Sequence, residues 1–160
     1  MKFIPYKSTL VWLLLIWCHT APAQQTGQAN GVTKIAKFKP PKVVSLLGIN
    51  SNGASVTIEE ANQLIALPLK VTDSAKNMYT VDTYHFLYKR KSVVEDERGT
   101  KQVSYTTVAD RFDKTPLPKI WVENIQDKLQ KSEELYFFDI IVKDKQGRRF
   151  FAPDLRLTIK

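Results

Sequence analysis

The sequence predicts an all-β fold: a β-sandwich, immunoglobulin-like and mostly antiparallel, with one amphipathic α-helix packed on it. Three observations lead to this prediction. Stretches that alternate apolar and polar residues recur along residues 43–160, and β-branched and aromatic side chains dominate the longest of them. Polar turns separate these stretches. One segment, residues 119–131, instead has apolar residues at helical spacing.

The first 23 residues have the features of an export signal. Two lysines precede an apolar run, residues 10–17, that is too short to span a bilayer, and Ala21-Pro22-Ala23 has the form of a cleavage site. We expect cleavage after Ala23, a periplasmic or otherwise exported chain, and no transmembrane segment after cleavage. Two alternatives stay open. One is an uncleaved anchor, and the other is lipid attachment at Cys18, which the bulky tryptophan before it disfavours.

Composition narrows the classes of function. The chain has 24 basic and 16 acidic residues, a formal net charge of +8. Basic and acidic residues are interspersed and no nucleic-acid-binding motif is present, so we do not expect nucleic acid as a partner. Removal of the signal would remove the single cysteine, and with it any thiolate nucleophile, disulfide or cysteine metal site. Residues 24–42 are polar, lysine-rich and end near Pro40-Pro41, which predicts a flexible linker.

The predicted domain, residues 43–160, begins with a short strand at residues 43–47. Thr57-Ile58-Glu59-Glu60 then has the form of a capping box, which predicts a helical turn, although the same letters could continue a strand. Residues 64–71 are apolar and predict a strand that Pro68 places near a sheet edge.

A long β-hairpin is predicted next. Residues 79–94 form its first strand and residues 102–109 its second, each with alternating side chains. Glu95-Asp96-Glu97-Arg98-Gly99-Thr100 forms a charged tip between them. Tyr84, Phe86 and Tyr88 share one face of the first strand.

The helix predicted at residues 119–131 starts just after Pro118, a residue that suits the first turn of a helix. Trp121, Ile125 and Leu129 follow one another at intervals of four residues, so they form one apolar stripe. We expect this stripe to pack on the sheet, with Trp121 as a core anchor.

The last stretch, residues 135–160, predicts a strand, a turn and a return. Residues 135–142 are apolar on both parities, interrupted by Asp139, so we expect a strand covered on both sides. Asp144-Lys145-Gln146-Gly147 predicts the turn, and Ala152-Pro153 interrupts the return. A buried charge needs a partner, so Asp139 is expected to pair with Arg148 or Arg149 across the turn.

Catalytic chemistry finds little support in the sequence. His85 is the only histidine after the signal, and no Gly-x-Ser-x-Gly elbow accompanies it, so we expect a structural histidine although Asp82 or Asp139 could orient it. The adjacent carboxylates of Glu95, Asp96 and Glu97 would splay apart, and no phosphate-binding glycine loop occurs. We expect no cofactor and no metal. A pair of carboxylates distant in sequence stays open, because their separation in space is not visible.

Several short motifs follow one another in a familiar order. They are the run Tyr79-Thr80-Val81-Asp82-Thr83-Tyr84-His85-Phe86, the amphipathic helix, Tyr136-Phe137-Phe138-Asp139-Ile140, and Gly147, Arg148, Arg149 and Pro153 before an alternating last strand. In this order residues 53–160 resemble the C-terminal periplasmic domain of the GldM family, the motor proteins of gliding motility and type IX secretion that include PorM. The sequence departs from the family at Lys131-Ser132-Glu133-Glu134, which lacks the usual glycine, and in the turn after the penultimate strand.

The resemblance implies a free-standing exported version of that distal domain. The family also has a membrane anchor and further domains, and without them this chain is not expected to couple an ion gradient to movement. The resemblance implies a non-enzymatic interaction module, protein partners of the cell envelope such as secretion-ring components, and self-association as a dimer. Its expected contact surface comprises Tyr84, Phe86, Tyr88, Glu95, Glu97 and Lys101. The alternative is an exported carbohydrate- or envelope-binding module that uses tyrosines as stacking platforms.

Overall fold

The computed structural model describes residues 37–160; the expected signal, Cys18 and most of the expected linker lie outside the described residues. Residues Phe38–Lys160 form one compact unit. The ring of Phe38 packs against that of Phe150, with 6.1 Å between the centroids, and the guanidinium of Arg148 covers it at 4.2 Å. The folded unit therefore takes in residues that composition assigns to the linker.

Eight strands and two short helices make up this unit. In chain order they are β1 (Val43–Leu47), β2 (Ala54–Val56), α1 (Ile58–Leu64), β3 (Leu69–Asp73), β4 (Met78–Glu95), β5 (Lys101–Phe112), α2 (Lys119–Gln126), β6 (Glu134–Lys143), β7 (Arg149–Phe151) and β8 (Leu155–Ile159). The predicted dominance of β-structure is confirmed, and so are both strands of the long hairpin. The helix that follows begins at Lys119 as predicted, but it ends at Gln126 and not at about residue 131. Neither helix in residues 37–160 is long and apolar enough to cross a membrane.

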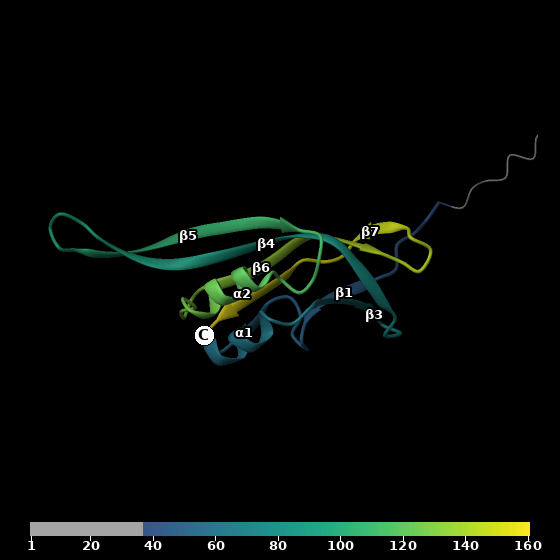
Figure 1. The fold of residues 1–160 in the computed structure, drawn as a ribbon, viewed down its shortest axis with the longest axis horizontal. Coiled ribbons are helices and arrows are strands. Elements are labelled where there is room, and N and C mark those ends of the chain that lie inside the picture. The colour runs from purple at the N-terminus through teal and green to yellow at the C-terminus, as the bar shows by residue number, and fades with distance from the viewer. Residues whose placement is uncertain (1–36) are drawn as a thin grey trace, which may run out of the picture. The chain divides into compact units, whose positions relative to one another are not determined.

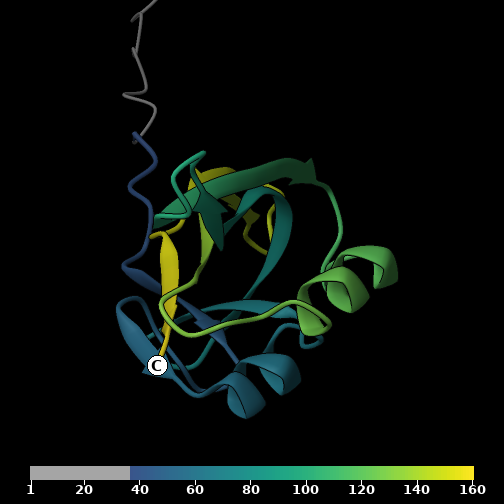
Figure 2. The same ribbon diagram turned by 90° about the vertical axis from the view of Figure 1, so that its left-hand side faces the viewer.

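All eight strands belong to one sheet that curls into a half-barrel (Figures 1 and 2). Strands β4 and β6 lie at its centre, and every strand pair is antiparallel except β2 with β8. The prediction was two facing sheets, as in a sandwich. One sheet forms because β4 is 18 residues long, so that it pairs with β3 near its start and with both β5 and β6 further along.

Two β-bulges explain the curl of the central strands. The pairing of β4 with β6 shifts twice, once between Val81 and Thr83 and once between Thr83 and His85. The first shift inserts Asp82 into β4, and the second inserts a residue into β6, where Asp139 has a left-handed backbone with φ of 48°. A bulge adds local twist and moves the following side chains to the other face of the strand.

The bulge at Asp139 corrects the prediction of a strand covered on both sides. Leu135 and Phe137 are buried before the bulge, and Ile140 and Val142 are buried after it. Because the bulge adds one residue, these four side chains all lie on the same buried face despite their opposite parities. The other face of β6 is partly open to solvent.

The helix α1 begins at the predicted capping box. The Glu60 amide donates to Thr57 Oγ1 at 3.2 Å, and the Thr57 amide donates to Glu60 Oε2 at 2.8 Å. The helix buries Ala61 and Leu64 against the core. Residues 37–160 thus form two helices where the predicted fold has one, and the strand predicted at residues 64–71 begins only at Leu69, because the helix uses the earlier apolar residues.

The second helix, α2, covers the open side of the curled sheet (Figure 2). Val122 and Ile125 are buried, and Trp121 packs against the core. The edge of the Trp121 ring system meets Phe86 at 5.8 Å and Phe112 at 5.5 Å between centroids. The predicted role of Trp121 as an anchor of helix on sheet is confirmed.

Candidate interaction site

The hairpin of β4 and β5 projects from the body of the folded unit (Figure 1). Residues 101–111 of β5 are all exposed, and β5 pairs with β4 alone among the described strands. The register between the two strands continues without a break from Tyr84 paired with Phe112 to Glu95 paired with Lys101. The second long edge of β5 therefore stays unpaired in residues 37–160.

One hydrogen bond determines which backbone groups of β5 face this unpaired edge. The Lys91 amide donates to Glu133 Oε1 at 2.8 Å, on the β6 side of β4, and so points away from β5. In an antiparallel ladder the backbone groups of a residue both point the same way, and the direction alternates along the strand. Tyr105, which lies opposite Lys91, therefore turns its backbone away from β4. The same applies to Val103, Thr107 and Ala109.

The unpaired edge lacks the features that usually prevent strand addition. Residues 102–109, QVSYTTVA, contain no charged residue and no proline, and the ladder has no bulge there. Natural proteins commonly protect exposed edges with lysine, proline, bulges or a covering segment. Only the end of the edge is blocked, where the Arg111 amide donates to Asp110 Oδ1 at 2.7 Å. The middle of β5 is a template for another strand.

Large apolar side chains of the hairpin are exposed on both of its faces. Val93, Val103 and Tyr105 share one face, with 58%, 57% and 44% of their surface exposed. Val94 and Val108 share the other face, at 55% and 47%. Scattered exposed apolar residues are ordinary, but a group of them on one projecting element indicates a contact surface.

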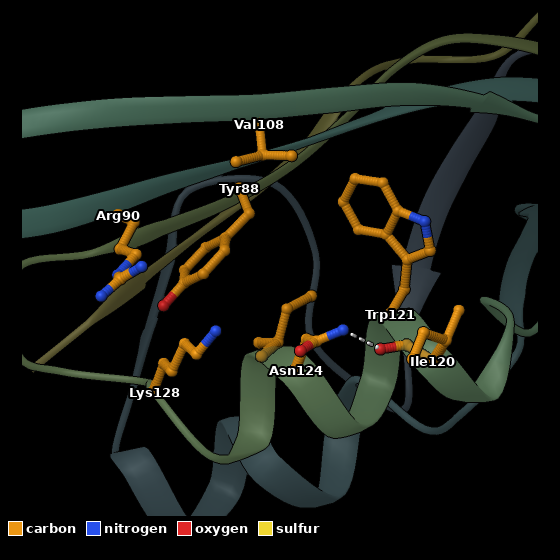
Figure 3. Close-up of a pocket in the computed structure, with 8 residues that line it drawn as sticks. Tyr88, Arg90, Val108, Ile120, Trp121, Asn124 and Lys128 are labelled. Carbon is orange, nitrogen blue, oxygen red and sulfur yellow. Dashed lines mark hydrogen bonds between the residues drawn. The ribbon is translucent and has the colours of Figure 1, made fainter.

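A groove lies between the hairpin and α2 (Figure 3). Its volume is about 250 Å³. The groove is lined by side chains of β4, of β5, and of α2 with the turn that follows it. They are Tyr88, Arg90, Val108, Ile120, Trp121, Asn124, Ile125 and Lys128. Val108 extends into the groove from β5, and Trp121 faces it from the helix (Figure 3). The lining is mainly apolar, so the groove suits an apolar side chain.

A buried carboxylate supports the wall of this groove. Glu133 is fully buried and accepts hydrogen bonds from the Tyr88 hydroxyl, the Lys91 amide and the Gln130 amide. Burial and the Glu133 carboxylate together raise the pKa of the Tyr88 phenol far above its usual value, burial being the larger cause. Tyr88 therefore stays neutral and fixed, and β4 is tied to the start of β6.

The charges at the groove have one sign. Arg90 and Lys128 line it, and no carboxylate does. Within residues 37–160 neither cation forms a salt bridge, and the nearby Glu133 already accepts three hydrogen bonds. The groove thus combines an apolar floor with two cations that are available to an anionic group.

The structure corrects half of the predicted contact surface. Tyr84, Phe86 and Tyr88 are 1%, 0% and 5% exposed, so their side chains belong to the core. They point inward because the half-barrel curls around this face of β4. The other predicted members are exposed near the tip of the hairpin. Glu95 ends β4, Glu97 lies in the turn, and Lys101 begins β5.

The predicted ion pair of Asp139 with Arg148 or Arg149 is wrong. Arg148 binds Asp144 within its own turn, with 2.6 Å from Nε to Oδ2, and Arg149 binds the bulge residue Asp82 at 2.8 Å. Lys143 also binds Asp82. Asp139 needs no such partner because its side chain is 63% exposed at the bulge.

The nearest resemblance to a catalytic pair is His85 with Asp139, at 3.6 Å from Nδ1 to Oδ2, too long for a hydrogen bond. The imidazole is stacked on Phe138, with 5.1 Å between ring centroids. Among residues 37–160 the Nδ1 atom of His85 has no hydrogen-bond partner, and no group of three metal-binding side chains occurs. This arrangement is that of a partly exposed histidine packed on an aromatic ring.

Two features of the site escape sequence reasoning. Glu133 lies in a polar run that predicts an exposed turn, and nothing in the run marks its burial. The unpaired edge of β5 is a property of strand order, although the uncharged run at residues 102–109 is a visible signal.

Comparison with known proteins gives no family assignment: no family model matches the chain, and no curated protein matches it.

Proposed function

We propose that this chain is a non-enzymatic protein-interaction module of the cell envelope. The observation that carries the proposal is the projecting hairpin, whose outer strand β5 is exposed, uncharged along residues 102–109 and unpaired on one edge among the described strands. An edge of this kind favours pairing with another polypeptide. The exposed valines of the hairpin add apolar contact area beside it.

The proposed setting follows from the sequence. The expected export signal supports a periplasmic location, and the resemblance to the distal domain of GldM supports an association with type IX secretion or gliding machinery. In that setting the partners would be envelope proteins such as secretion-ring components. A second copy of the chain is a further candidate. The immunoglobulin-like arrangement expected from the sequence belongs to the same proposal, and the mostly antiparallel pairing of the strands supports it.

Aromatic side chains on the outer face of β6 argue against the carbohydrate-binding alternative. Tyr136 and Phe138 are stacked at 5.1 Å with 15° between their planes, and Phe138 is stacked on His85 in the same way. The guanidinium of Arg156 covers the Tyr136 ring at 4.5 Å. Sugar stacking needs a free aromatic face, and these rings cover one another. The outer face of β6 therefore gives no support to sugar stacking, although Tyr105 on β5 and Phe151 on β7 are exposed, at 44% and 70%.

Capture from envelope extract tests the proposal. The mature chain is immobilised, and the retained proteins are identified for the unchanged chain and for Val103→Lys, which adds a charge to the exposed face of β5. The matched control is Val44→Lys, because Val44 is also an exposed strand valine, 49% exposed, but lies on β1. We expect secretion-ring or other envelope proteins to be retained and to be lost with Val103→Lys only.

Two results would contradict the proposal. Retention of glycan without any protein partner would favour the alternative function. Equal loss of partners with both lysine variants would show that charge, and not the hairpin, governs capture.

A further inference from the structure

We propose that β5 binds an extended acidic-apolar segment of a partner protein as an added ninth strand, with one apolar side chain of that segment in the groove beside α2. This inference rests on the proposed function and specifies the chemistry of the partner. Three independent observations support it: the direction of the free backbone groups, the position of the groove, and the sign of its charges.

The first observation concerns the backbone. Val103, Tyr105, Thr107 and Ala109 turn their amide and carbonyl groups toward the unpaired edge, as the Lys91 to Glu133 hydrogen bond requires. These alternate residues offer the donor and acceptor pattern of an ordinary antiparallel or parallel ladder. An extended peptide would satisfy them without any rearrangement of β4 or β5.

The second observation concerns the groove. Val108 lines the groove, and side chains of one strand alternate between faces, so Thr106 and Ser104 lie on the same face of β5. Side chains of an added strand that face this side would point toward Ile120 and Trp121. The groove of about 250 Å³ exceeds the ~30 Å³ that one water occupies in the liquid, so it has room for a side chain of several heavy atoms.

The third observation concerns charge, and it distinguishes a partner segment from a second copy of this chain. Arg90 and Lys128 flank the groove without a salt bridge in residues 37–160, so an incoming carboxylate would gain two cationic neighbours. Residues 102–109 of a second copy contain no carboxylate. Pairing with this uncharged run of a second copy would bring no carboxylate to either cation, whereas an acidic segment would neutralise them.

A peptide library displaying about eight random residues, the length of the uncharged edge, tests the proposal on the full exported chain. We expect enrichment of sequences that alternate, with leucine, valine or an aromatic residue at one position and glutamate or aspartate nearby. The most enriched peptide is then synthesised with a fluorescent label, and its dissociation constant is measured by anisotropy.

Two variants at one position separate strand addition from other modes of binding. Thr107→Pro removes an amide that faces the unpaired edge and leaves the β4–β5 ladder intact, because proline is tolerated where no ladder donor is needed. Thr107→Val keeps the amide. We expect Thr107→Pro to weaken peptide binding about tenfold, the value of roughly one hydrogen bond together with steric obstruction, and Thr107→Val to have little effect. Circular dichroism checks that both variants are folded.

The double variant Arg90→Gln and Lys128→Gln tests the acidic character of the segment. We expect it to weaken binding about tenfold at low salt and much less at high salt, because salt screens exposed charges. Enrichment of basic peptides, no enrichment at all, or peptides that bind Thr107→Pro and the unchanged chain equally would overturn the inference. A dimer that Thr107→Pro dissociates, with no peptide enriched, would assign the edge to a second copy and leave the proposed function standing.

Discussion

The backbone amide of Lys91 donates a hydrogen bond to the buried carboxylate of Glu133, with 2.8 Å from N to Oε1. This contact joins the point where β4 leaves the body of the domain to the start of β6. It also sets the alternation of the hairpin ladder, so that Tyr105 on β5 presents its backbone to the unpaired edge. The buried carboxylate thereby connects the core to the proposed binding edge.

Substitution of Glu133 is expected to be strongly destabilising. Glu133→Ala would leave the Tyr88 hydroxyl and the amides of Lys91 and Gln130 without an acceptor, at a cost of about 3 kcal/mol in the free energy of unfolding. Urea denaturation followed by circular dichroism measures this change. The neighbouring variant Glu134→Ala is the control, since Glu134 forms only partly exposed ion pairs, with Lys89 at 3.0 Å and with Arg156 at 4.0 Å. Similar losses for the two variants would contradict the role given to Glu133.

Amide hydrogen exchange is expected to alternate along β5. The amides of Gln102, Ser104 and Thr106 face β4, and those of Val103, Tyr105 and Thr107 face solvent. The first set should exchange at least about tenfold more slowly than the second in the unbound chain. Nuclear magnetic resonance resolves the individual amides. Uniform protection of both sets would mean that the second edge of β5 is already paired in solution.

Acid is expected to weaken the fold at the bulge of β4. Hydrogen bonding to Lys143, together with the charges of Arg149 and Lys143, keeps the pKa of Asp82 below its ordinary value. A carboxyl whose pKa is lower in the folded state adds stability that is fully present above its ordinary pKa, here 3.8, and that is lost as the pH falls below this value through the folded pKa. Urea midpoints measured at several pH values should therefore fall less steeply with acid in Asp82→Asn than in the unchanged chain. An identical pH dependence would exclude a role for this cluster.

The bulge at Asp139 allows a matched pair of substitutions. Its backbone has φ of 48°, which glycine adopts without cost and alanine does not. Asp139→Ala should lower the free energy of unfolding by about 1 kcal/mol, while Asp139→Gly should leave it nearly unchanged. Thermal unfolding measures both variants. Equal losses for the two variants would mean that the carboxylate, which both of them remove, matters at this position and the backbone conformation does not.

The sequence predicts most strands because alternation reports directly on burial. The strands at residues 79–94 and 102–109 and the turn at Asp144-Lys145-Gln146-Gly147 are found where the pattern places them, and Gly147 has the expected positive φ of 79°. The capping box at Thr57 also predicts the start of α1 correctly. These features depend on residues close together in the chain, so local chemistry is sufficient to predict them.

Other features depend on residues far apart in the chain. The alternation pattern of residues 135–142 predicts a strand that is covered on both sides. This prediction is wrong because the bulge at Asp139 arises only when β6 pairs with β4. Arg149 forms its ion pair with Asp82 and not with Asp139. The reason is that β7 pairs with the end of β6 that lies beside the start of β4. The inward direction of Tyr84 follows from the curl of the sheet, which alternation within one strand does not report. Of the contact surface predicted from the sequence, Tyr88 lines the groove, whereas the unpaired edge of β5 and the other residues of the groove are not predicted.

The most direct test of the central claim uses photo-crosslinking from the hairpin in intact cells. Tyr105 and, in a separate chain, Met78 are each replaced by p-benzoylphenylalanine; both are exposed strand residues, 44% and 58%, and Met78 lies at the start of β4 away from the tip. We expect irradiation to join an envelope protein to the chain through position 105 and not through position 78. Equal adducts from both positions, or none from position 105 in cells that carry the machinery, would contradict it.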